Sequence, residues 1–281
     1  RYHITFVIGV PTVLEELADA QEKNNYDLSS LSGIITMGSP LERSACLHYQ
    51  KVLTPNIYNG YGTTETLWNT FPRPFDLPEY AGTAGASMVD DDVRVVKIYE
   101  DHKAEPDDVA AMDGQEIGEV VICSPAKSPY MYFNNENETN SKYHNGFIYT
   151  GDLATWDKNQ YITILGRKDD MIISSGENIY PTEIEEVLNK NPKVKDCIVT
   201  SVPDKMRGQV VTAYVVRADH SLKPEDLDQF CKDSPYIANF KRPRFYRFVE
   251  QIPRNATGKK LHVKIKEIAK DDLINGLLYR V

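Results

Sequence analysis

The beginning of the chain alternates between short apolar runs and amphipathic stretches. Apolar side chains occupy every second position of residues 4–8, which is the period of a β-strand. Pro11 opens the next segment and is a residue suited to the first turn of a helix. The predicted helix is expected to turn one face inward, made of Val13, Leu14, Leu17 and Ala18.

This alternation of element types continues to residue 58. Residues 33–37 predict a short buried strand, residues 41–52 a helix, and residues 56–58 a strand that leads into a Gly/Thr-rich turn. Strands that alternate with helices are typical of a parallel sheet covered by helices. Residues 1–81 are therefore expected to be an α/β subdomain.

The pattern changes between residues 82 and 167. Short β-like runs are separated there by hydrophilic loops, of which residues 101–118 and 134–146 are the most polar. Such spacing predicts a β-rich subdomain. The runs are residues 93–99, 119–123, 147–150 and 161–165.

The last part of the chain, residues 168–281, predicts a compact α+β unit of its own. Pro181 begins a helix that would turn Ile184, Val187 and Leu188 inward. Strands are expected at residues 197–202, 210–217 and 244–249, and helices at residues 224–232 and after His262. The fold class predicted for the chain is thus α/β plus α+β.

Composition and charge exclude several classes of protein. The chain has 281 residues, of which 41% are hydrophobic and 26% charged, as in a globular domain. Its 41 acidic against 32 basic residues give a net charge of −9, which argues against nucleic acid as a partner. No run approaches the ~18 apolar residues of a membrane span, and no signal peptide opens the chain. The four cysteines lack the spacing of a zinc or redox site, so we expect a cytoplasmic protein.

The first segment with candidate chemistry is residues 59–65, Asn-Gly-Tyr-Gly-Thr-Thr-Glu, at the predicted end of a strand. Ligands gather at the carboxyl ends of strands in α/β sheets. Gly60 and Gly62 would let the backbone approach a ligand, and Thr63 and Thr64 would add hydroxyl donors suited to a phosphate. Glu65 could hold a hard cation such as Mg²⁺ against that phosphate. The alternative is an ordinary turn after a strand.

Two further segments could contact a nucleotide. Asp152 ends the segment 149–152, Tyr-Thr-Gly-Asp, and its carboxylate could accept hydrogen bonds from two ribose hydroxyls. The alternative is a turn aspartate bound to its own backbone. Arg167 lies in the segment 166–170, Gly-Arg-Lys-Asp-Asp, at the predicted domain boundary, where a charged turn is the alternative.

A fourth segment, residues 253–259, places Lys259 at the tip of a Gly/Thr loop. Such a lysine is a cation that can reach a developing anion. The alternative is a solvated loop lysine. The full spacing of a phosphate-binding loop, with four residues between Gly and Gly-Lys, is missing.

The four segments in this order resemble the second half of the adenylate-forming enzyme superfamily. That superfamily includes acyl-CoA synthetases, adenylation domains of peptide synthetases and luciferases. The resemblance extends over essentially the whole chain, from residues 9–12 through residues 38–41 to Lys259. It implies that an acid reacts with ATP to give acyl-AMP and pyrophosphate, and that a thiol then displaces AMP.

The resemblance also implies a nucleotide site. Asn59 would bond the adenine edge, and Tyr61 would stack on its face. Asp152 would take both ribose hydroxyls, with help from Arg167. The remaining nucleotide-binding residues implied are Gly38, Ser39, Pro40, Gly60, Gly62 and Thr63.

Three residues are implied in catalysis. Thr64 would hold the α-phosphate, Glu65 would ligate Mg²⁺, and Lys259 would bridge carboxylate, phosphate and ribose oxygens during adenylation. Carboxylate attack on a triphosphate brings anions together, so fixed cations are expected to supply the stabilisation.

The resemblance places a hinge at Asp169, about which a small mobile C-terminal domain would turn between the two half-reactions. Ser175 and Gly176 would then contact coenzyme A. Many acyl-CoA ligases have Gly-Gly where this chain has Ser175-Gly176, which leaves a backbone contact of Gly176 available.

The sequence therefore predicts an AMP-forming acyl-CoA ligase that uses ATP, Mg²⁺ and coenzyme A on a small carboxylic acid. The family's Ser/Thr/Gly-rich phosphate loop would precede Arg1, so we expect a C-terminal fragment that is inactive alone. An adenylation domain acting on a carrier-protein thiol and a non-catalytic AMP-binding relic are the alternatives. A homodimeric assembly is left open.

Overall fold

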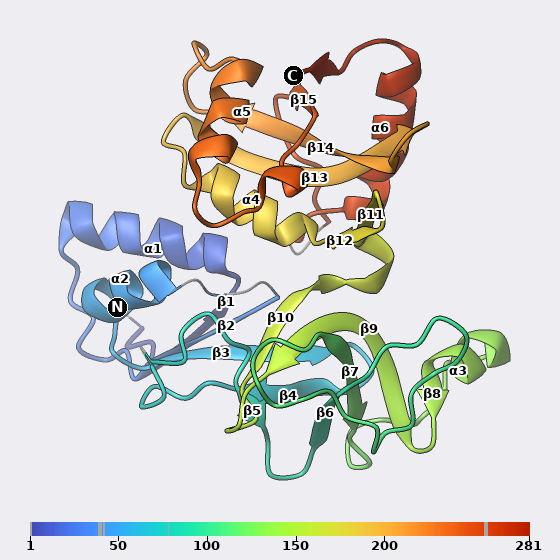
Figure 1. Ribbon diagram of the computed structural model, residues 1–281. Helices are drawn as coiled ribbons and strands as arrows, with labels where there is room; N and C mark the ends of the chain where they lie inside the picture. The colour runs from blue at the N-terminus through green and yellow to red at the C-terminus, as the bar shows by residue number, and fades with distance from the viewer. Residues whose placement is uncertain (1, 39–40, 42, 78, 256–257) are drawn as a thin grey trace. The chain divides into compact units, whose positions relative to one another are not determined.

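A computed structural model describes residues 2–38, 41, 43–77, 79–255 and 258–281 of the chain. These residues divide into two compact units, Arg1–Ile164 and Leu165–Val281 (Figure 1). The predicted α/β plus α+β fold class is confirmed. Within the described residues, no helix has both the length and the apolar composition that crossing a bilayer requires.

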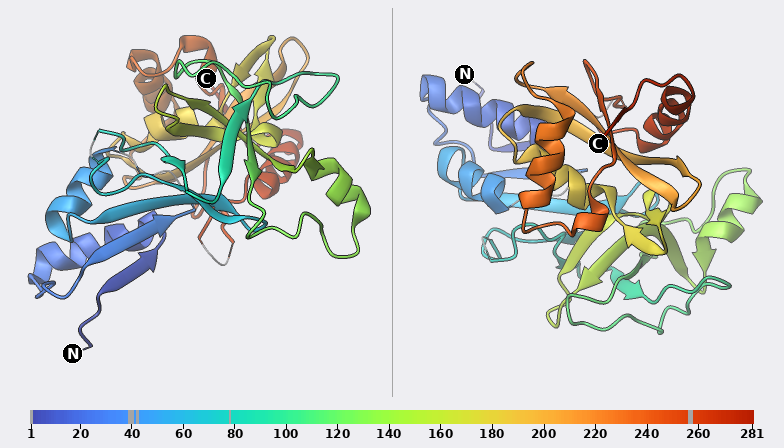
Figure 2. Two further views of the ribbon diagram at one scale, coloured as in Figure 1. Left: turned by 90° about the horizontal axis from the view of Figure 1, so that it is seen from below. Right: turned by 45° about the horizontal axis from the view of Figure 1, so that its top comes forward.

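The first sheet of the N-terminal unit contains five strands in the order β1-β2-β3-β4-β5. The first three strands are parallel, and β4 and β5 are added antiparallel. Figures 1 and 2 show the two helices of this region together against one face of the parallel strands. The elements are β1 (Phe6–Gly9), α1 (Pro11–Asn24), β2 (Gly33–Met37), α2 (Arg43–Val52), β3 (Ile57–Thr63), β4 (Leu67–Phe71) and β5 (Ala86–Ser87).

Helix α1 buries a narrower face than its sequence predicts. Leu14 and Ala18, four residues apart, are fully buried in the cluster that also contains Ile34 and Ile57 of the sheet. The prediction was wrong for Val13 and Leu17, whose exposed fractions are 41% and 38%. Side chains four residues apart lie on one face of a helix, so Leu14 and Ala18 are buried together while Val13 and Leu17 stay partly exposed.

The second sheet of this unit has the strand order β10-β9-β7-β6, with β8 beside β9. Its core contains Val95, Val120, Ile122 and Trp156. The Trp156 indole N–H donates to the Ala110 carbonyl at 3.0 Å. Helix α3 buries no residue, and Figure 2 shows it extending beyond the strands. The elements are β6 (Asp92–Val96), β7 (Gly118–Cys123), α3 (Glu136–Lys142), β8 (Tyr143–His144), β9 (Phe147–Trp156) and β10 (Ile162–Arg167).

The C-terminal unit is a sheet with helices on both faces. The strand order is β12-β11-β14-β15-β16, with β13 beside β14. Helices α4 and α5 pack on the face that carries Cys197 and Val199, and α6 packs on the face that carries Ile198 and Val202 (Figures 1 and 2). The alternation of these side chains along β13 follows from the two-residue period of a strand.

The elements of this unit follow the predicted order of helices and strands. They are the 3₁₀ turn η1 (Lys168–Asp170), β11 (Ile172–Ser174), β12 (Glu177–Ile179), α4 (Pro181–Asn189), β13 (Val194–Asp204), β14 (Gly208–Arg217), α5 (Pro224–Asp233), η2 (Asn239–Lys241), β15 (Phe245–Phe248), α6 (His262–Ile274) and β16 (Tyr279–Arg280).

Candidate functional site

Strand β3 carries the first candidate segment and changes its pairing partner within that segment. Its first half pairs parallel with β2, up to Gly60 opposite Met37. Its second half pairs antiparallel with β4, from Tyr61 opposite Thr70. The predicted turn at residues 59–65 is therefore wrong in extent, because residues 59–63 lie inside a strand and the turn begins at Thr64.

Asn59 is buried in this strand, with an exposed fraction of 5%. Its side-chain N–H donates to the Thr83 carbonyl at 3.4 Å, whereas its buried Oδ1 has no hydrogen-bond partner among the described residues. A buried acceptor without a donor costs free energy. An amino group on the edge of a bound base would supply the missing donor.

Tyr61 and Asp152 come together from the two sheets of the N-terminal unit. The Tyr61 hydroxyl donates to Asp152 Oδ2 at 2.7 Å. The Tyr61 ring packs against the hydrophobic core of the second sheet. The two residues, 91 positions apart in the sequence, therefore form one polar and aromatic surface.

Asp152 lies in the middle of β9, not at a strand end as its sequence predicts. The register between β7 and β9 shifts near Val120, so residues 150–152 form a β-bulge. The Thr150 hydroxyl donates to the Val120 carbonyl at 2.8 Å and accepts from the Asp152 N–H at 3.0 Å. Gly151 has a positive φ of 75°, which favours glycine. Bulges of this kind redirect one side chain out of a strand.

Glu119 supports the bulge, and the sequence analysis did not identify it. Its carboxylate accepts from the Gly151 N–H at 3.1 Å, across from the bulged strand. Glu119 and residues 150–152 lie on two different strands. No local sequence pattern relates them, because they meet only when the two strands pair.

Close packing explains the glycines at positions 60 and 62, whereas the sequence predicts that they let the backbone approach a ligand. A Cβ at Gly62 would lie 1.7 Å from the Leu67 carbonyl oxygen, and one at Gly60 would lie 2.9 Å from Cε1 of Phe71. The hairpin of β3 and β4 leaves no room for a side chain at these positions. Thr66 and Asn69, also missed, fix the same hairpin through a 2.6 Å hydrogen bond.

Thr64 is exposed in the β3–β4 turn, and Glu65 beside it is half-buried. The Tyr132 hydroxyl, another residue that the sequence analysis missed, donates to Glu65 Oε1 at 2.5 Å. Partial burial raises the pKa of the Glu65 carboxyl, but hydrogen bonds from Tyr132 and neighbouring groups outweigh it and hold the pKa below its usual value. Glu65 is therefore ionised at neutral pH.

The donor set around Glu65 suits magnesium better than a metal held by protein groups alone. Among the described residues, no group of three or more His, Cys, Asp or Glu side chains could hold an ion. Mg²⁺ is usually bound by one or two carboxylates together with substrate phosphates and water. A single ionised carboxylate beside the Thr64 hydroxyl fits this pattern.

Ser175 and Gly176 form the tip of a tight hairpin between β11 and β12. Both have positive φ, 56° and 84°. A two-residue turn with this conformation matches the twist of its strands and favours glycine at both positions. Ser175 thus adopts a backbone conformation that costs a side-chain-bearing residue free energy.

The remaining predicted residues are placed as follows. Gly38 follows β2 with a φ of 85°, and Ser39 and Pro40 lie outside the described residues. Arg167 ends β10, and Asp169 lies in the 3₁₀ turn η1, where its carbonyl accepts from Lys266 Nζ at 3.4 Å.

Lys259 lies in the segment 254–260, which precedes α6 and whose two end residues, Arg254 and Lys260, form an antiparallel bridge. Residues 256 and 257 lie outside the described residues. Its backbone is held by Asn255, which accepts the Lys259 N–H on Oδ1 at 2.9 Å and donates its own N–H to the Lys259 carbonyl at 2.9 Å. Its side chain is exposed, and no hydrogen bond or ion pair of its ammonium is found within the described part of the chain. The ammonium is therefore available to an anion.

Comparison with known proteins gives matches over both units. Residues 1–129 match the family model described as AMP-binding enzyme, and residues 183–259 match the AMP-binding enzyme C-terminal domain. The second match ends at Lys259.

Curated relatives and solved structures extend the likeness to almost the whole chain. A long-chain-fatty-acid–CoA ligase of Yersinia pestis is 30% identical over 95% of this chain and 45% of that protein. An uncharacterized acyl–CoA ligase of Bacillus subtilis is 29% identical over 95% of this chain and 49% of its own. The structure of Bacillus subtilis o-succinylbenzoate CoA synthetase with its acyl-adenylate intermediate has a TM-score of 0.81 at 29% identity, covering 95% of this chain and 51% of that one. The chain spans about half the length of the curated relatives it matches.

Proposed function

Because the chain belongs to the AMP-binding enzyme family, we propose that the protein containing it is an AMP-forming acyl-CoA ligase. It would activate a carboxylic acid with ATP and transfer the acyl group to coenzyme A. The observation that carries the proposal is the junction of Tyr61 and Asp152 beside the unpartnered buried oxygen of Asn59. Together these groups would offer the base an aromatic face and an acceptor for its amine. They would offer the ribose a carboxylate that accepts from its hydroxyls.

In this proposal the N-terminal unit binds the nucleotide. The adenine amine would donate to Asn59 Oδ1, and the ring would lie on Tyr61, whose hydroxyl is already bound to Asp152. The Asp152 carboxylate would accept hydrogen bonds from the ribose hydroxyls. The bulge at residues 150–152 fixes the direction of that carboxylate in advance, which would lower the cost of ordering it when the nucleotide binds.

Thr64 and Glu65 would act on the phosphates. The Thr64 hydroxyl would donate to an α-phosphate oxygen, and the Glu65 carboxylate, held by Tyr132, would take a magnesium ion that neutralises phosphate charge when bound. The carboxylate of the acid attacks the α-phosphorus, a P–O bond forms, and pyrophosphate leaves with the electrons of the broken P–O bond.

Lys259 would supply the second cation for this step. Its exposed ammonium can approach the attacking carboxylate and the α-phosphate, where negative charge gathers in the transition state. In the second half-reaction the thiolate of coenzyme A attacks the acyl carbon, and AMP leaves. A turn of the C-terminal unit about Asp169 would exchange Lys259 for the Ser175–Gly176 hairpin between the two steps.

The class of acid is tested with a panel of carboxylic acids. Relatives named for long-chain fatty acids and a structure named for o-succinylbenzoate stand at nearly the same identity to this chain. The panel therefore includes acetic, octanoic, hexadecanoic, malonic and benzoic acids.

The test uses the intact protein with ATP, Mg²⁺ and each acid. Exchange of labelled pyrophosphate into ATP reports the first half-reaction, and the coenzyme A thioester reports the second. Acid-dependent exchange followed by thioester formation is the expected result. Binding of AMP without exchange on any acid of the panel would instead favour a non-catalytic nucleotide-binding protein, and exchange without a coenzyme A thioester would favour transfer to a carrier-protein thiol.

A further inference from the structure

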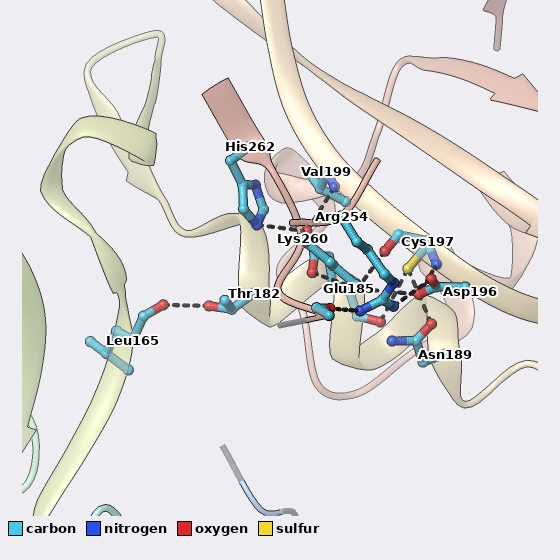
Figure 3. A network of polar contacts seen from close by, with 11 residues as sticks. Leu165, Thr182, Glu185, Asn189, Asp196, Cys197, Val199, Arg254, Lys260 and His262 are labelled. Atoms are coloured by element: carbon cyan, nitrogen blue, oxygen red, sulfur yellow. Dashed lines mark hydrogen bonds and ion pairs between the residues drawn. The ribbon is translucent and has the colours of Figure 1, made fainter. Parts of the chain in front are cut away.

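A cluster of charged side chains lies against the segment 254–260, which carries Lys259. None of the roles proposed above involves this cluster. Glu185 comes from α4, Asp196 from β13, and Arg254 and Lys260 from the two arms of the segment (Figure 3). The side chains of Glu185 and Lys260 are only 9% and 19% exposed. Two carboxylates therefore face two cations at the base of the segment that carries Lys259.

Lys260 is the centre of the cluster. Its ammonium donates to Glu185 Oε2 at 3.1 Å and to the Cys197 carbonyl at 2.5 Å, and it lies 3.4 Å from Asp196 Oδ1. Two of the three N–H donors of an ammonium group are thus hydrogen-bonded, and the second carboxylate adds an ion pair. Burial lowers the pKa of Lys260, but the neighbouring carboxylates outweigh it and raise the pKa above its usual value. Lys260 is thus a mostly buried, charged lysine with two hydrogen bonds and a second carboxylate close by.

Glu185 is itself held in place. Its Oε1 accepts from the Val199 N–H at 2.8 Å, and His262 Nε2 lies 3.7 Å from the same oxygen. This leaves Oε2 directed at Lys260, as Figure 3 shows. The C-terminal arm of the segment is therefore attached to a carboxylate that cannot turn away without losing a backbone hydrogen bond.

Arg254 attaches the other arm. Its guanidinium donates to Asp196 Oδ2 at 2.7 Å and to the Gly258 carbonyl at 2.6 Å. Arg254 and Lys260 also form an antiparallel backbone bridge. Asp196 is shared, since one of its oxygens faces Arg254 and the other faces Lys260. Both arms of the segment are thus bound to the same carboxylate.

The register of the segment connects this cluster to Lys259. Neighbouring residues of an extended strand point to opposite sides. The Lys260 side chain is bound inward, whereas Lys259 beside it is exposed. A one-residue slip would exchange the two lysines, and the bonds of Lys260 oppose that slip.

We propose that Lys260, Glu185, Asp196 and Arg254 are positioning residues that fix the direction of Lys259 for adenylation. The inference rests on the proposed function of Lys259, and it extends that function to residues that do not touch the substrate. Their loss should affect the half-reaction that uses Lys259 and leave the thioester step in place.

The experiment compares Lys260→Met with Lys264→Met in the intact protein. Lys264 is an exposed lysine on α6, close in sequence and outside the cluster, so its variant controls for the loss of one charge. Hydrogen exchange is measured on residues 254–262, and pyrophosphate exchange on the acid of the panel with the highest rate. Thioester formation is measured from the preformed adenylate of that acid.

We expect Lys260→Met to raise the exchange rate of residues 254–262 by about tenfold or more. The adenylation kcat should fall by about 10–100-fold, with the KM for ATP and the thioester step within about twofold of the wild type. Lys264→Met should change none of these quantities. Arg254→Gln removes only the contacts of Arg254 and should give a smaller change in the same direction. It replaces Lys260→Met in the experiment if that variant does not fold.

Two results would overturn the inference. One is adenylation by Lys260→Met and Arg254→Gln at the rate of Lys264→Met. The other is an equal fall of both half-reactions, which would assign the cluster to the stability of the unit alone. Lys259→Ala separates this failure from that of the proposed function, because normal adenylation by Lys259→Ala would contradict the role of Lys259 itself.

Discussion

The Tyr61 hydroxyl donates a hydrogen bond to Asp152 Oδ2 at 2.7 Å, and this contact joins two strands at points where the pairing register of each strand shifts. On β3 the register shifts directly after Tyr61, and on β9 it shifts at residues 150–152. The extra residue at the first shift is Asn69 of β4, and the second shift is the bulge of β9, which redirects a side chain out of its strand. The contact thus depends on two local irregularities in two different sheets.

Replacing Asp152 tests the nucleotide role of this contact. Asp152→Ala removes the carboxylate proposed to accept two ribose hydroxyls, so we expect the Kd for AMP to rise by about tenfold or more, as for loss of a charged hydrogen bond of about 1.5–3 kcal/mol. Calorimetry on the intact protein measures it. Asp113→Ala, which removes an exposed turn carboxylate of the same unit, should leave the Kd unchanged. An unchanged Kd in Asp152→Ala would remove Asp152 from the site.

Lys259→Ala separates the two half-reactions. The ammonium is proposed to stabilise charge only while the adenylate forms, so we expect adenylation to fall by about 10²–10³-fold. Thioester formation from supplied acyl-AMP should stay within about threefold of the wild type. Pyrophosphate exchange and thioester release are the two measurements. Equal losses in both would contradict a role confined to the first step.

The Ser175–Gly176 turn predicts opposite stability changes at neighbouring positions. Both residues have positive φ, which penalises a side chain by roughly 1–2 kcal/mol. Gly176→Ala should therefore lower the free energy of unfolding by about that amount, whereas Ser175→Gly should raise it by up to about 1 kcal/mol. Urea unfolding measures both. A destabilised Ser175→Gly would show that the serine side chain contributes contacts that outweigh its backbone cost.

Lys127 and Asp91 form an ion pair whose loss should be costly. Lys127 Nζ donates to Asp91 Oδ2 at 2.5 Å and to the Trp68 carbonyl at 2.6 Å, and the Asp91 side chain is fully buried. Lys127→Met would leave that carboxylate without its cation, at an expected cost of about 3–5 kcal/mol. The double variant with Asp91→Asn should recover part of the loss. No recovery in urea unfolding would mean that the Trp68 contact carries most of the effect.

The buried cysteines predict that the free energy of unfolding changes with pH under alkaline conditions. Burial raises the pKa of Cys46 and of Cys231 to about 11. The unfolded chain loses these protons at lower pH, near 9, so the free energy of unfolding should fall as the pH rises from about 9 towards 11.

Thiol labelling checks the same groups directly. At pH 8 the half-buried Cys123 should react with a thiol reagent in the folded protein, and the three buried cysteines only after unfolding. Labelling of Cys46, Cys197 or Cys231 at the rate of Cys123 would contradict their burial.

The sequence predicted those features that depend on local order. The succession of strands and helices and the helix start at Pro181 follow from periodicity and turn chemistry. The length of β9 did not follow, because Gly151 and Asp152 resemble a turn until Glu119 of the neighbouring strand binds the bulge.

Contacts between distant segments could not be predicted. Tyr132 and Glu65 lie 67 residues apart, and Lys260 and Glu185 lie 75 residues apart. No periodicity relates such pairs, since the relation arises only when strands are placed side by side. Lys260 also follows a lysine with a proposed catalytic role, and the sequence does not tell which of the two side chains turns inward.

The crowded hairpin at Gly60 and Gly62 bears on how this motif persists through evolution. Leu67 and Phe71 leave no space for a side chain at either position, whatever the strand binds. A descendant that had lost its chemistry would keep both glycines for as long as it kept this pair of strands. Mutational drift would first reach the residues that the fold does not need, such as the exposed Lys259 and Thr64. Lys259 and Thr64, and not the two glycines, are therefore the positions of this motif whose retention among relatives would bear on the proposed catalysis.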